Sequence, residues 1–123
     1  MSKEAGSATI SDLARHLSVC RKTAEKIADY FEERCGLRRL EHPTRKYHWE
    51  DIWELEGSFD VLPKNWHRMK APLLRTQDLY FPGVYGRSER TIRRRAAEGT
   101  LKSIKLPIIG YRFRESEVEK EWM

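Results

Sequence analysis

The sequence predicts a mainly α-helical α+β fold with small β-hairpins, built as two small units in tandem. The chain has 123 residues, of which 39% are hydrophobic and 35% charged, so it can hold one ordinary domain or two very small ones with thin cores. Apolar residues recur at helical spacing only over short segments. A pattern that begins at Gly36 is repeated from Gly99, which predicts that one structural unit occurs twice.

The first copy begins with two helices. Residues 9–17 (TISDLARHL) carry apolar side chains at helical spacing, and Thr9 or Ser11 can cap their first turn. The break SVC separates this helix from a second one over 21–35, which has its own apolar stripe. Gly36 ends the second helix, because glycine readily adopts the left-handed conformation of a C-terminal cap.

The second copy repeats the helix pair. A short helix is expected over 76–81 (TQDLYF), followed by a longer turn, PGVYG. Ser88 then caps a helix over 89–98, and Gly99 stops it.

A β-hairpin and an acidic, Trp-containing helix follow each helix pair. The strands are expected at 37–41 and 46–49 in the first copy and at 101–106 and 111–114 in the second. Pro43 marks the first turn, and Pro107 and Gly110 mark the second, since these residues favour tight bends. By this alignment the aromatic residues correspond as Tyr47 with Tyr111 and Trp49 with Phe113.

Helix, turn, helix, β-hairpin and helix together form the winged-helix plan. We expect one winged helix-turn-helix unit at 8–57 and another at 73–123. The connecting residues 58–72 contain Phe59, Val61, Leu62 and Trp66, which predicts a packed linker with a short helix after Pro63. The two units are therefore expected to keep a fairly fixed position relative to each other.

Basic residues are concentrated in the second unit. Residues 1–57 carry ten Lys and Arg against eleven Asp and Glu, whereas residues 73–123 carry eleven against seven. Within 87–114, nine basic residues accompany only Glu89 and Glu98. A basic stretch this dense favours a polyanionic partner, and the alternative is a solvated charged face.

Two segments carry a resemblance to a known family. TISDLARHLSVCRKTAEKI and TQDLYFPGVYGRSERTIRRRAAEGTLKSIKL, each followed by a hairpin, resemble the MerR/excisionase superfamily of winged helices. The resemblance covers most of the chain, twice, and implies binding of double-stranded DNA. MerR-type regulators carry a long dimerising helix and an effector domain after this unit, whereas this sequence stops at Met123. Small excisionase-like proteins usually have one such unit.

The second unit offers the stronger candidate DNA contacts. In a helix-turn-helix the N-terminal half of the second helix faces the base edges in the major groove. Arg90, Arg93 and Arg94 lie on one face of that helix, where three guanidinium groups repel one another unless an anion relieves them. The candidate DNA-binding residues of this helix are Arg87, Ser88, Arg90, Thr91, Arg93 and Arg94. The resemblance adds backbone or minor-groove contacts from the wing, at Lys102, Lys105, Arg112 and Arg114.

The apolar tip of the second wing leaves two interpretations open. Pro107, Ile108, Ile109 and Gly110 form this tip, which could wedge against the sugars of a duplex or pack on the neighbouring unit.

The first unit is more ambiguous. Its candidate DNA-binding residues are Arg21, Lys22, Thr23 and Lys26 on the second helix and Arg45 and Lys46 at the wing tip. Acidic residues follow on the exposed side of that helix, namely Glu25, Asp29, Glu32 and Glu33. The first unit is therefore either a second DNA reader, about 10 base pairs from the other, or a degraded copy that serves protein contacts.

Other kinds of site find little support in the sequence. Cys20 and Cys35 lack the close spacing of a structural zinc site and are expected to be small reduced core residues. Trp49 and Trp53 are expected in the core rather than in a ligand cage. No catalytic constellation, metal site or cofactor motif is present, and no apolar run could span a membrane. The N-terminus lacks the apolar core of a signal peptide, so a cytoplasmic protein is expected. The expected DNA binding would make it a bacterial or phage nucleoid-associated protein.

These observations lead to three functional hypotheses. The first is a non-enzymatic accessory protein, similar to excisionases, that binds specific duplex sites as a monomer or DNA-assembled oligomer. It would bend those sites to direct a recombinase or regulate a promoter. The second is a compact transcriptional regulator without an effector domain. The third is a protein-interaction adaptor of the phage packaging or replication type.

Overall fold

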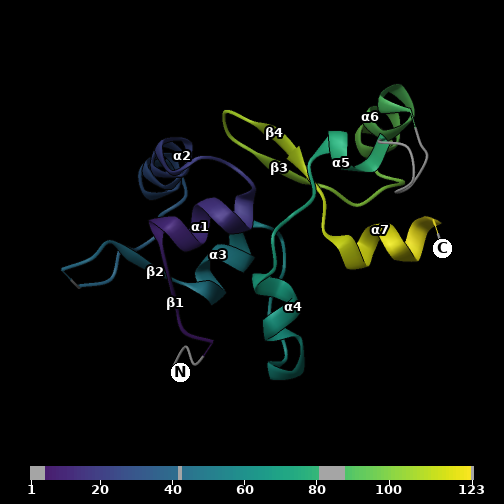
Figure 1. The fold of residues 1–123 in the computed structure, drawn as a ribbon. Helices are drawn as coiled ribbons and strands as arrows, with labels where there is room; N and C mark the ends of the chain where they lie inside the picture. The colour runs from purple at the N-terminus through teal and green to yellow at the C-terminus, as the bar shows by residue number, and fades with distance from the viewer. Residues whose placement is uncertain (1–4, 42, 81–87, 123) are drawn as a thin grey trace. The chain divides into compact units, whose positions relative to one another are not determined.

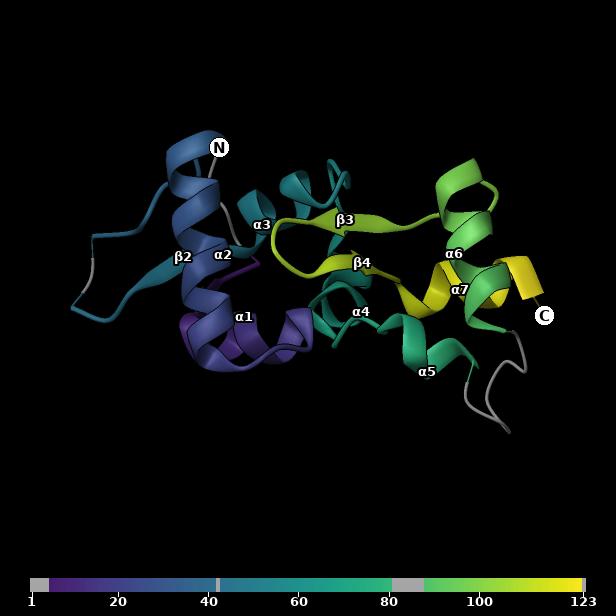
Figure 2. The ribbon, with the colours of Figure 1, turned by 90° about the horizontal axis from the view of Figure 1, so that it is seen from above.

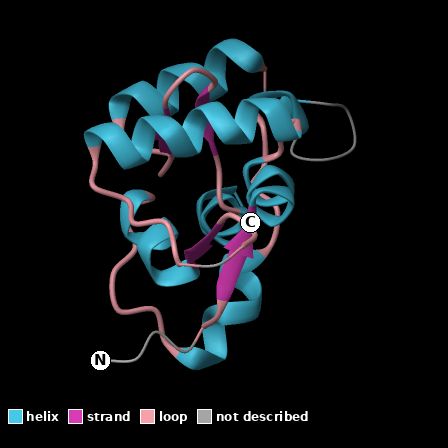
Figure 3. Ribbon diagram, turned by 90° about the vertical axis from the view of Figure 1, so that its left-hand side faces the viewer, coloured by secondary structure: helices cyan, strands magenta, loops and turns pink. Residues whose placement is uncertain are grey.

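The computed structural model describes residues 5–41, 43–80 and 88–122, and the chain divides into two compact units (Figure 1). Unit 1 is Met1–Pro72 and unit 2 is Leu73–Met123. Short helices and two small antiparallel sheets make up the described residues (Figure 3), so the fold is mixed α+β. Residues 58–72, expected to be a linker between the units, belong to unit 1.

Unit 1 contains two strands, four α-helices and one 3-10 helix in its described residues. They are β1 (Ser7–Thr9), α1 (Ile10–Leu17), α2 (Arg21–Arg34), β2 (Lys46–His48), α3 (Trp49–Leu55), η1 (Pro63–Asn65) and α4 (Trp66–Lys70). Thr9 caps α1 through a capping box, in which Thr9 Oγ1 accepts from the Asp12 N–H and the Asp12 carboxylate accepts from the Thr9 N–H. The helix pair follows the predicted order, and α1 crosses α2 (Figure 2).

The sheet of unit 1 differs from the predicted hairpin. No strand forms at 37–41, and β2 instead pairs antiparallel with β1, with Ala8 opposite Tyr47. The Leu37 N–H donates to the Phe31 carbonyl at the end of α2, and the Leu40 N–H donates to the Lys46 carbonyl in β2. The prediction was wrong because the true partner strand precedes the helices and is too short to show alternation.

The core of unit 1 includes the residues after α3. Trp53 is fully buried, and its indole Nε1–H donates to the Met69 carbonyl in α4 at 3.0 Å. Trp49 stacks on Trp53 with ring centroids 6.0 Å apart, which confirms the expectation that this pair packs in the core. Cys20 and Cys35, expected in the core, are both exposed free thiols, because they lie at the two ends of α2 rather than on its buried face.

Unit 2 has helices and a hairpin in the predicted order, with strands shorter than the predicted 101–106 and 111–114. Its elements are α5 (Thr76–Tyr80), α6 (Glu89–Glu98), β3 (Ile104–Leu106), β4 (Gly110–Arg112) and α7 (Glu115–Trp122). The hairpin extends out from the three helices (Figure 2). One apolar cluster joins these elements, formed by Leu79, Ile92, Ala96, Leu101, Phe113 and Val118.

The two units repeat one strand pairing. In unit 2 an isolated bridge joins Leu74, just before α5, to Phe113, just after β4. This bridge corresponds to the pair of Ala8 and Tyr47 in unit 1, and the same sequence interval separates the members of both pairs. Tyr47 therefore corresponds to Phe113. The sequence pattern had matched Tyr47 to Tyr111, which lies two residues earlier. Alternation of side chains leaves the register of a strand undetermined by steps of two residues, which is why the sequence pattern alone aligns Tyr47 with Tyr111.

Candidate nucleic-acid interface

Helix α6 presents its arginines to solvent. Ile92 and Ala96 face the core of unit 2, with exposed fractions of 0% and 8%. Arg90, Arg93 and Arg94 are all exposed on the other side. Both faces follow from the helical period, which brings residues three and four apart together. The predicted cationic face of α6 is thus accessible, while Arg87, also predicted to contact DNA, lies outside the described residues.

Ser88 and Thr91 act together at the start of α6. Ser88 Oγ accepts from the Thr91 N–H at 3.2 Å and lies 2.8 Å from Thr91 Oγ1. These bonds satisfy one of the free N–H groups at the helix end. The hydroxyl groups of both predicted DNA-contact residues are therefore engaged in capping α6.

The β3–β4 hairpin of unit 2 and the residues just before it expose lysines but bury an arginine. Lys105 is exposed between buried Ile104 and Leu106, and Lys102 is also exposed. Arg112 retains only 9% exposure, and its guanidinium donates to the Tyr111 carbonyl at 3.0 Å. Its burial follows from the strand register, because Arg112 lies opposite core-facing Ile104 whereas Tyr111 lies opposite Lys105. Arg112, a candidate DNA contact, thus lies off the exposed surface that carries Lys105.

Ile108 at the tip of this hairpin has an unusual backbone. Its φ is +74°, and 66% of its surface is exposed. A left-handed conformation is strained for a β-branched residue. The tip therefore holds a large apolar side chain in solvent at a conformational cost.

Unit 1 offers a weaker cationic surface on the corresponding helix. Lys22 and Lys26 are exposed, but the Arg21 guanidinium lies 3.6 Å from the Glu25 carboxylate. Thr23 Oγ1 lies 3.2 Å from the Cys20 sulfur, and hydrogen bonding to Thr23 lowers the pKa of that thiol. The basic start of α2 is therefore partly neutralised along its own helix.

A polar network that we call the Arg45 cluster joins α2 to the residues around the start of β2 in unit 1. It consists of Asp29, Glu32, Arg39, Arg45 and Tyr47. The Arg45 guanidinium lies 2.6 Å from Asp29 and 2.7 Å from Glu32, and its side chain is only 20% exposed. Burial alone would lower the pKa of Arg45, but hydrogen bonds within the cluster hold it above its ordinary value.

Arg45, a candidate DNA contact, is thus paired with Asp29 and Glu32 in this structure. Its neighbour Lys46 remains partly exposed. The signal that could have identified the cluster was the i, i+3 spacing of Asp29 and Glu32, which places both acids on the face of α2 that contacts Arg45.

Other kinds of site are not evident in the part of the chain that the structure describes. No group of three His, Cys, Asp or Glu side chains there is arranged to hold a metal ion. Among the same residues, no helix has the length and apolar character needed to cross a membrane. No protein-family model, curated protein or solved structure matches this chain.

Proposed function

We propose that unit 2 is a winged helix-turn-helix that binds double-stranded DNA, with α6 in the major groove and the β3–β4 hairpin as its wing. The observation that carries this proposal is the exposed face of Arg90, Arg93 and Arg94 on a helix whose opposite face is anchored in the core. A rigid support behind the helix favours reproducible contacts with base edges.

The energetics of this face favour an anionic partner. Like charges three and four residues apart on a helix destabilise it by about 0.2–0.5 kcal/mol per pair. Arg93 is already paired with Glu89 at 2.6 Å, so the penalty remains between Arg90 and Arg94. Phosphate and guanine oxygens remove it, and one bidentate contact between arginine and guanine discriminates among bases by about 1–3 kcal/mol. Lys102 and Lys105 extend the positive surface toward the wing.

The biological role that we propose is that of a non-enzymatic accessory factor similar to excisionases. It binds specific sites and bends them to direct a recombinase or regulate a promoter. A compact transcriptional regulator would read DNA through the same helix without needing to bend it. A fluorescence-energy-transfer assay on end-labelled duplexes separates the two roles, because only bending shortens the distance between the ends.

The test of DNA binding is fluorescence anisotropy with a labelled duplex at several salt concentrations. The double variant Arg90→Glu/Arg94→Glu should lower affinity at least tenfold and flatten the salt dependence, since fewer counterions are released. The matched control is Lys64→Glu/Arg68→Glu, which makes the same charge change at exposed positions of unit 1. Equal losses in both variants would mean that net charge alone drives binding, which contradicts a specific role for α6.

Unit 1 supports a second candidate function, docking of a partner protein. The Arg45 cluster removes a cation from its wing, and a groove of about 690 Å³ lies beside exposed Phe59. Phe59 is 67% exposed, and an exposed aromatic ring is typical of protein interfaces. The discriminating measurement is whether Phe59→Ser weakens DNA binding. Docking would be favoured if Phe59→Ser left the DNA affinity unchanged but abolished binding of a recombinase or packaging partner. The wild type should retain that partner in high salt, because binding through DNA phosphates weakens steeply with salt.

A further inference from the structure

The turn of the β3–β4 hairpin presents one large apolar side chain to solvent. Ile108 is 66% exposed, whereas its neighbours Pro107 and Ile109 are half-buried. Among the residues of unit 2 that the structure describes, Ile108 is the one large apolar side chain that is exposed in this way. The apolar character of the hairpin tip is therefore concentrated in a single side chain.

A strained turn holds this side chain at the tip. The Ile109 N–H donates to the Pro107 carbonyl at 2.8 Å, which closes a γ-turn with Ile108 at its centre. The φ of Ile108 is +74°, and the form of γ-turn with a positive φ is rare and strained. Gly110, two residues further on, adopts its own positive φ without a side chain. A β-branched residue in such a backbone is typical of a functional position.

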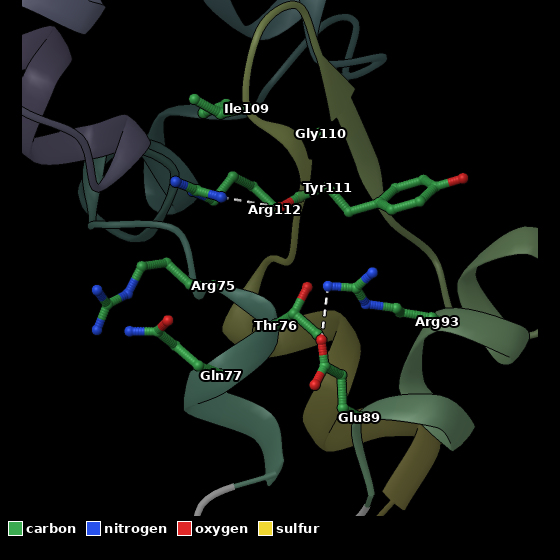
Figure 4. Close-up of a pocket in the computed structure, with 9 residues that line it drawn as sticks. All are labelled: Arg75, Thr76, Gln77, Glu89, Arg93, Ile109, Gly110, Tyr111 and Arg112. Atoms are coloured by element: carbon green, nitrogen blue, oxygen red, sulfur yellow. Dashed lines mark hydrogen bonds and ion pairs between the residues drawn. The ribbon is translucent and has the colours of Figure 1, made fainter.

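The hairpin gives Ile108 a fixed support. Ile104 and Leu106 of β3 are buried, with exposed fractions of 7% and 4%, and Leu106 pairs with Gly110 at the last rung before the turn. Ile109 and Gly110 lie at the end of the hairpin remote from α5 and α6 (Figure 4). A β-branched side chain also has few rotamers, so Ile108 loses little conformational entropy when it is inserted into a partner.

The charges near Ile108 match a nucleic-acid groove. Lys105 on β3 is exposed three residues before Ile108, and Lys102 is exposed just before the hairpin. A duplex groove has sugars and base edges inside it and phosphates along both rims. An apolar tip with ammonium groups behind it is complementary to both parts of such a groove.

The dimensions of the duplex favour the minor groove, because α6 is proposed to lie in the major groove. The minor groove is about 6 Å wide. The two strands of a hairpin are already about 4.8 Å apart before their side chains are counted. The hairpin as a whole is therefore too wide to enter, and only the side chain at its tip can reach the base pairs. Aliphatic side chains that enter the minor groove in this way push between base pairs and kink the duplex.

We propose that Ile108 inserts between two adjacent base pairs from the minor groove and kinks the duplex at a pyrimidine–purine step. The inference rests on the proposed DNA-binding function and deepens it, because it names the side chain that bends the DNA and the kind of sequence at which it acts. Pyrimidine–purine steps unstack most easily, so insertion there costs least. Lys105 binds a phosphate on the rim of the groove beside Ile108.

The first test selects duplexes from a random library, once with the wild-type chain and once with Ile108→Ala. The wild type should enrich a pyrimidine–purine step at a fixed spacing from the bases that α6 contacts. Ile108→Ala should keep those bases and lose the step. Leu62→Ala is the matched control, because it removes as many carbon atoms from a side chain of unit 1 that is 55% exposed, and it should select the wild-type site. A wild-type pool without the step, or an Ile108→Ala pool that retains it, would overturn the wedge.

The second test places 2-aminopurine at the selected step, where its fluorescence rises when the base is unstacked. Binding of the wild type should raise this fluorescence and shorten the distance between the labelled ends of the duplex. Ile108→Ala should leave both signals at their free-DNA values and bind about tenfold more weakly, because an apolar side chain is no longer buried. Ile108→Leu keeps an apolar side chain of the same size and should retain the unstacking. Equal unstacking by Ile108→Ala and the wild type would contradict the proposal.

Protein stability distinguishes a wedge from a packing role. Because the Ile108 side chain is largely exposed and its backbone is strained, Ile108→Gly should melt at or above the wild-type temperature. The same variant should bend the duplex no more than Ile108→Ala does. A melting temperature below that of the wild type would mean that Ile108 packs against protein, and the wedge would be wrong.

Failure of the wedge can be distinguished from failure of the proposed function. The wild type could select a specific duplex that Arg90→Glu/Arg94→Glu does not bind, without unstacking or bending it. That result would overturn the wedge and leave DNA binding by α6 intact. A wild-type chain that binds no duplex would overturn both.

Discussion

The His16 imidazole Nε2 lies 2.6 Å from the Glu56 carboxylate, and both side chains are buried in unit 1. On the other side of the ring, Nδ1 lies 2.8 Å from the Ala71 carbonyl. A carbonyl can only accept, so Nδ1 must donate to it. The pair therefore joins α1, the end of α3 and the residues that follow α4.

We predict that Glu56→Gln destabilises unit 1 by about 3 kcal/mol, because removing one partner of a buried pair leaves the other poorly compensated. The measurement is urea denaturation followed by tryptophan fluorescence, since Trp49 and Trp53 lie in the same core. Glu54→Gln, at an exposed position of α3, is the control and should change stability by less than about 0.5 kcal/mol. Equal effects of the two variants would show that the pair contributes nothing specific.

The Arg45 cluster should make unit 1 sensitive to acid. Burial tends to raise the pKa of Glu32, but hydrogen bonds from Arg39, Tyr47 and Arg45 outweigh it, and the net pKa lies below its ordinary value. The cluster therefore stabilises the fold fully above the ordinary glutamate range, and this contribution is lost as pH falls through the lowered pKa.

Glu32→Gln tests this dependence. At pH 7 it should destabilise unit 1 by about 1.5 kcal/mol, the value of a hydrogen bond to a charged group. The difference from the wild type should shrink as the pH of a series of thermal melts falls below about 4. Glu33→Gln, the exposed neighbour, should melt like the wild type throughout. A difference that persists undiminished at low pH would contradict the electrostatic origin.

Ile108 should be a site where substitution stabilises the fold. Its φ of +74° costs a non-glycine residue about 1–2 kcal/mol, and its 66% exposure means that little packing is lost on truncation. Ile108→Gly should therefore raise the stability of unit 2 by about 1 kcal/mol in thermal melts. Ile109→Gly is the contrasting variant, since the φ of Ile109 is not positive, and it should not stabilise. Destabilisation by Ile108→Gly would mean that the Ile108 side chain makes stabilising packing contacts in solution.

Each unit should respond separately to loss of its own core. Ile92 and Ile27 are both fully buried, in unit 2 and unit 1 respectively. Ile92→Ala should destabilise unit 2 by about 2–5 kcal/mol through the cavity it leaves, and Ile27→Ala should do the same to unit 1. Amide hydrogen exchange measured residue by residue should show faster exchange in the altered unit alone. Matching acceleration in both units would show that they fold as one cooperative body.

Local chemistry explains which features could be predicted from the sequence. Thr9 and Ser88 cap their helices, and Gly99 ends α6 with a φ of +80°, because caps depend on residues only a few positions apart. The separation of Arg90 and Arg94 from Ile92 on α6 likewise depends only on the helical period.

Features that depend on residues far apart in the chain could not be predicted from the sequence. Pairing of β1 with β2 joins residues on either side of two helices, and residues 58–72 belong to unit 1 because Trp53 and His16 bind carbonyls near the end of α4. Strand alternation does not reveal which face of β4 is buried. The burial of Arg112 was decided by its position opposite Ile104 in the hairpin.

The sequence by itself determined the helix pairs, the caps of α1 and α6 and the exposed arginines of α6, since each follows from interactions within one or two turns of chain. The tertiary structure alone decided which charges remain exposed to a partner. Arg45 is neutralised by acids from another element, whereas Arg90 and Arg94 remain exposed on α6. The physical reason is that electrostatic pairing acts through space, and only folding brings residues far apart in the chain within reach of one another.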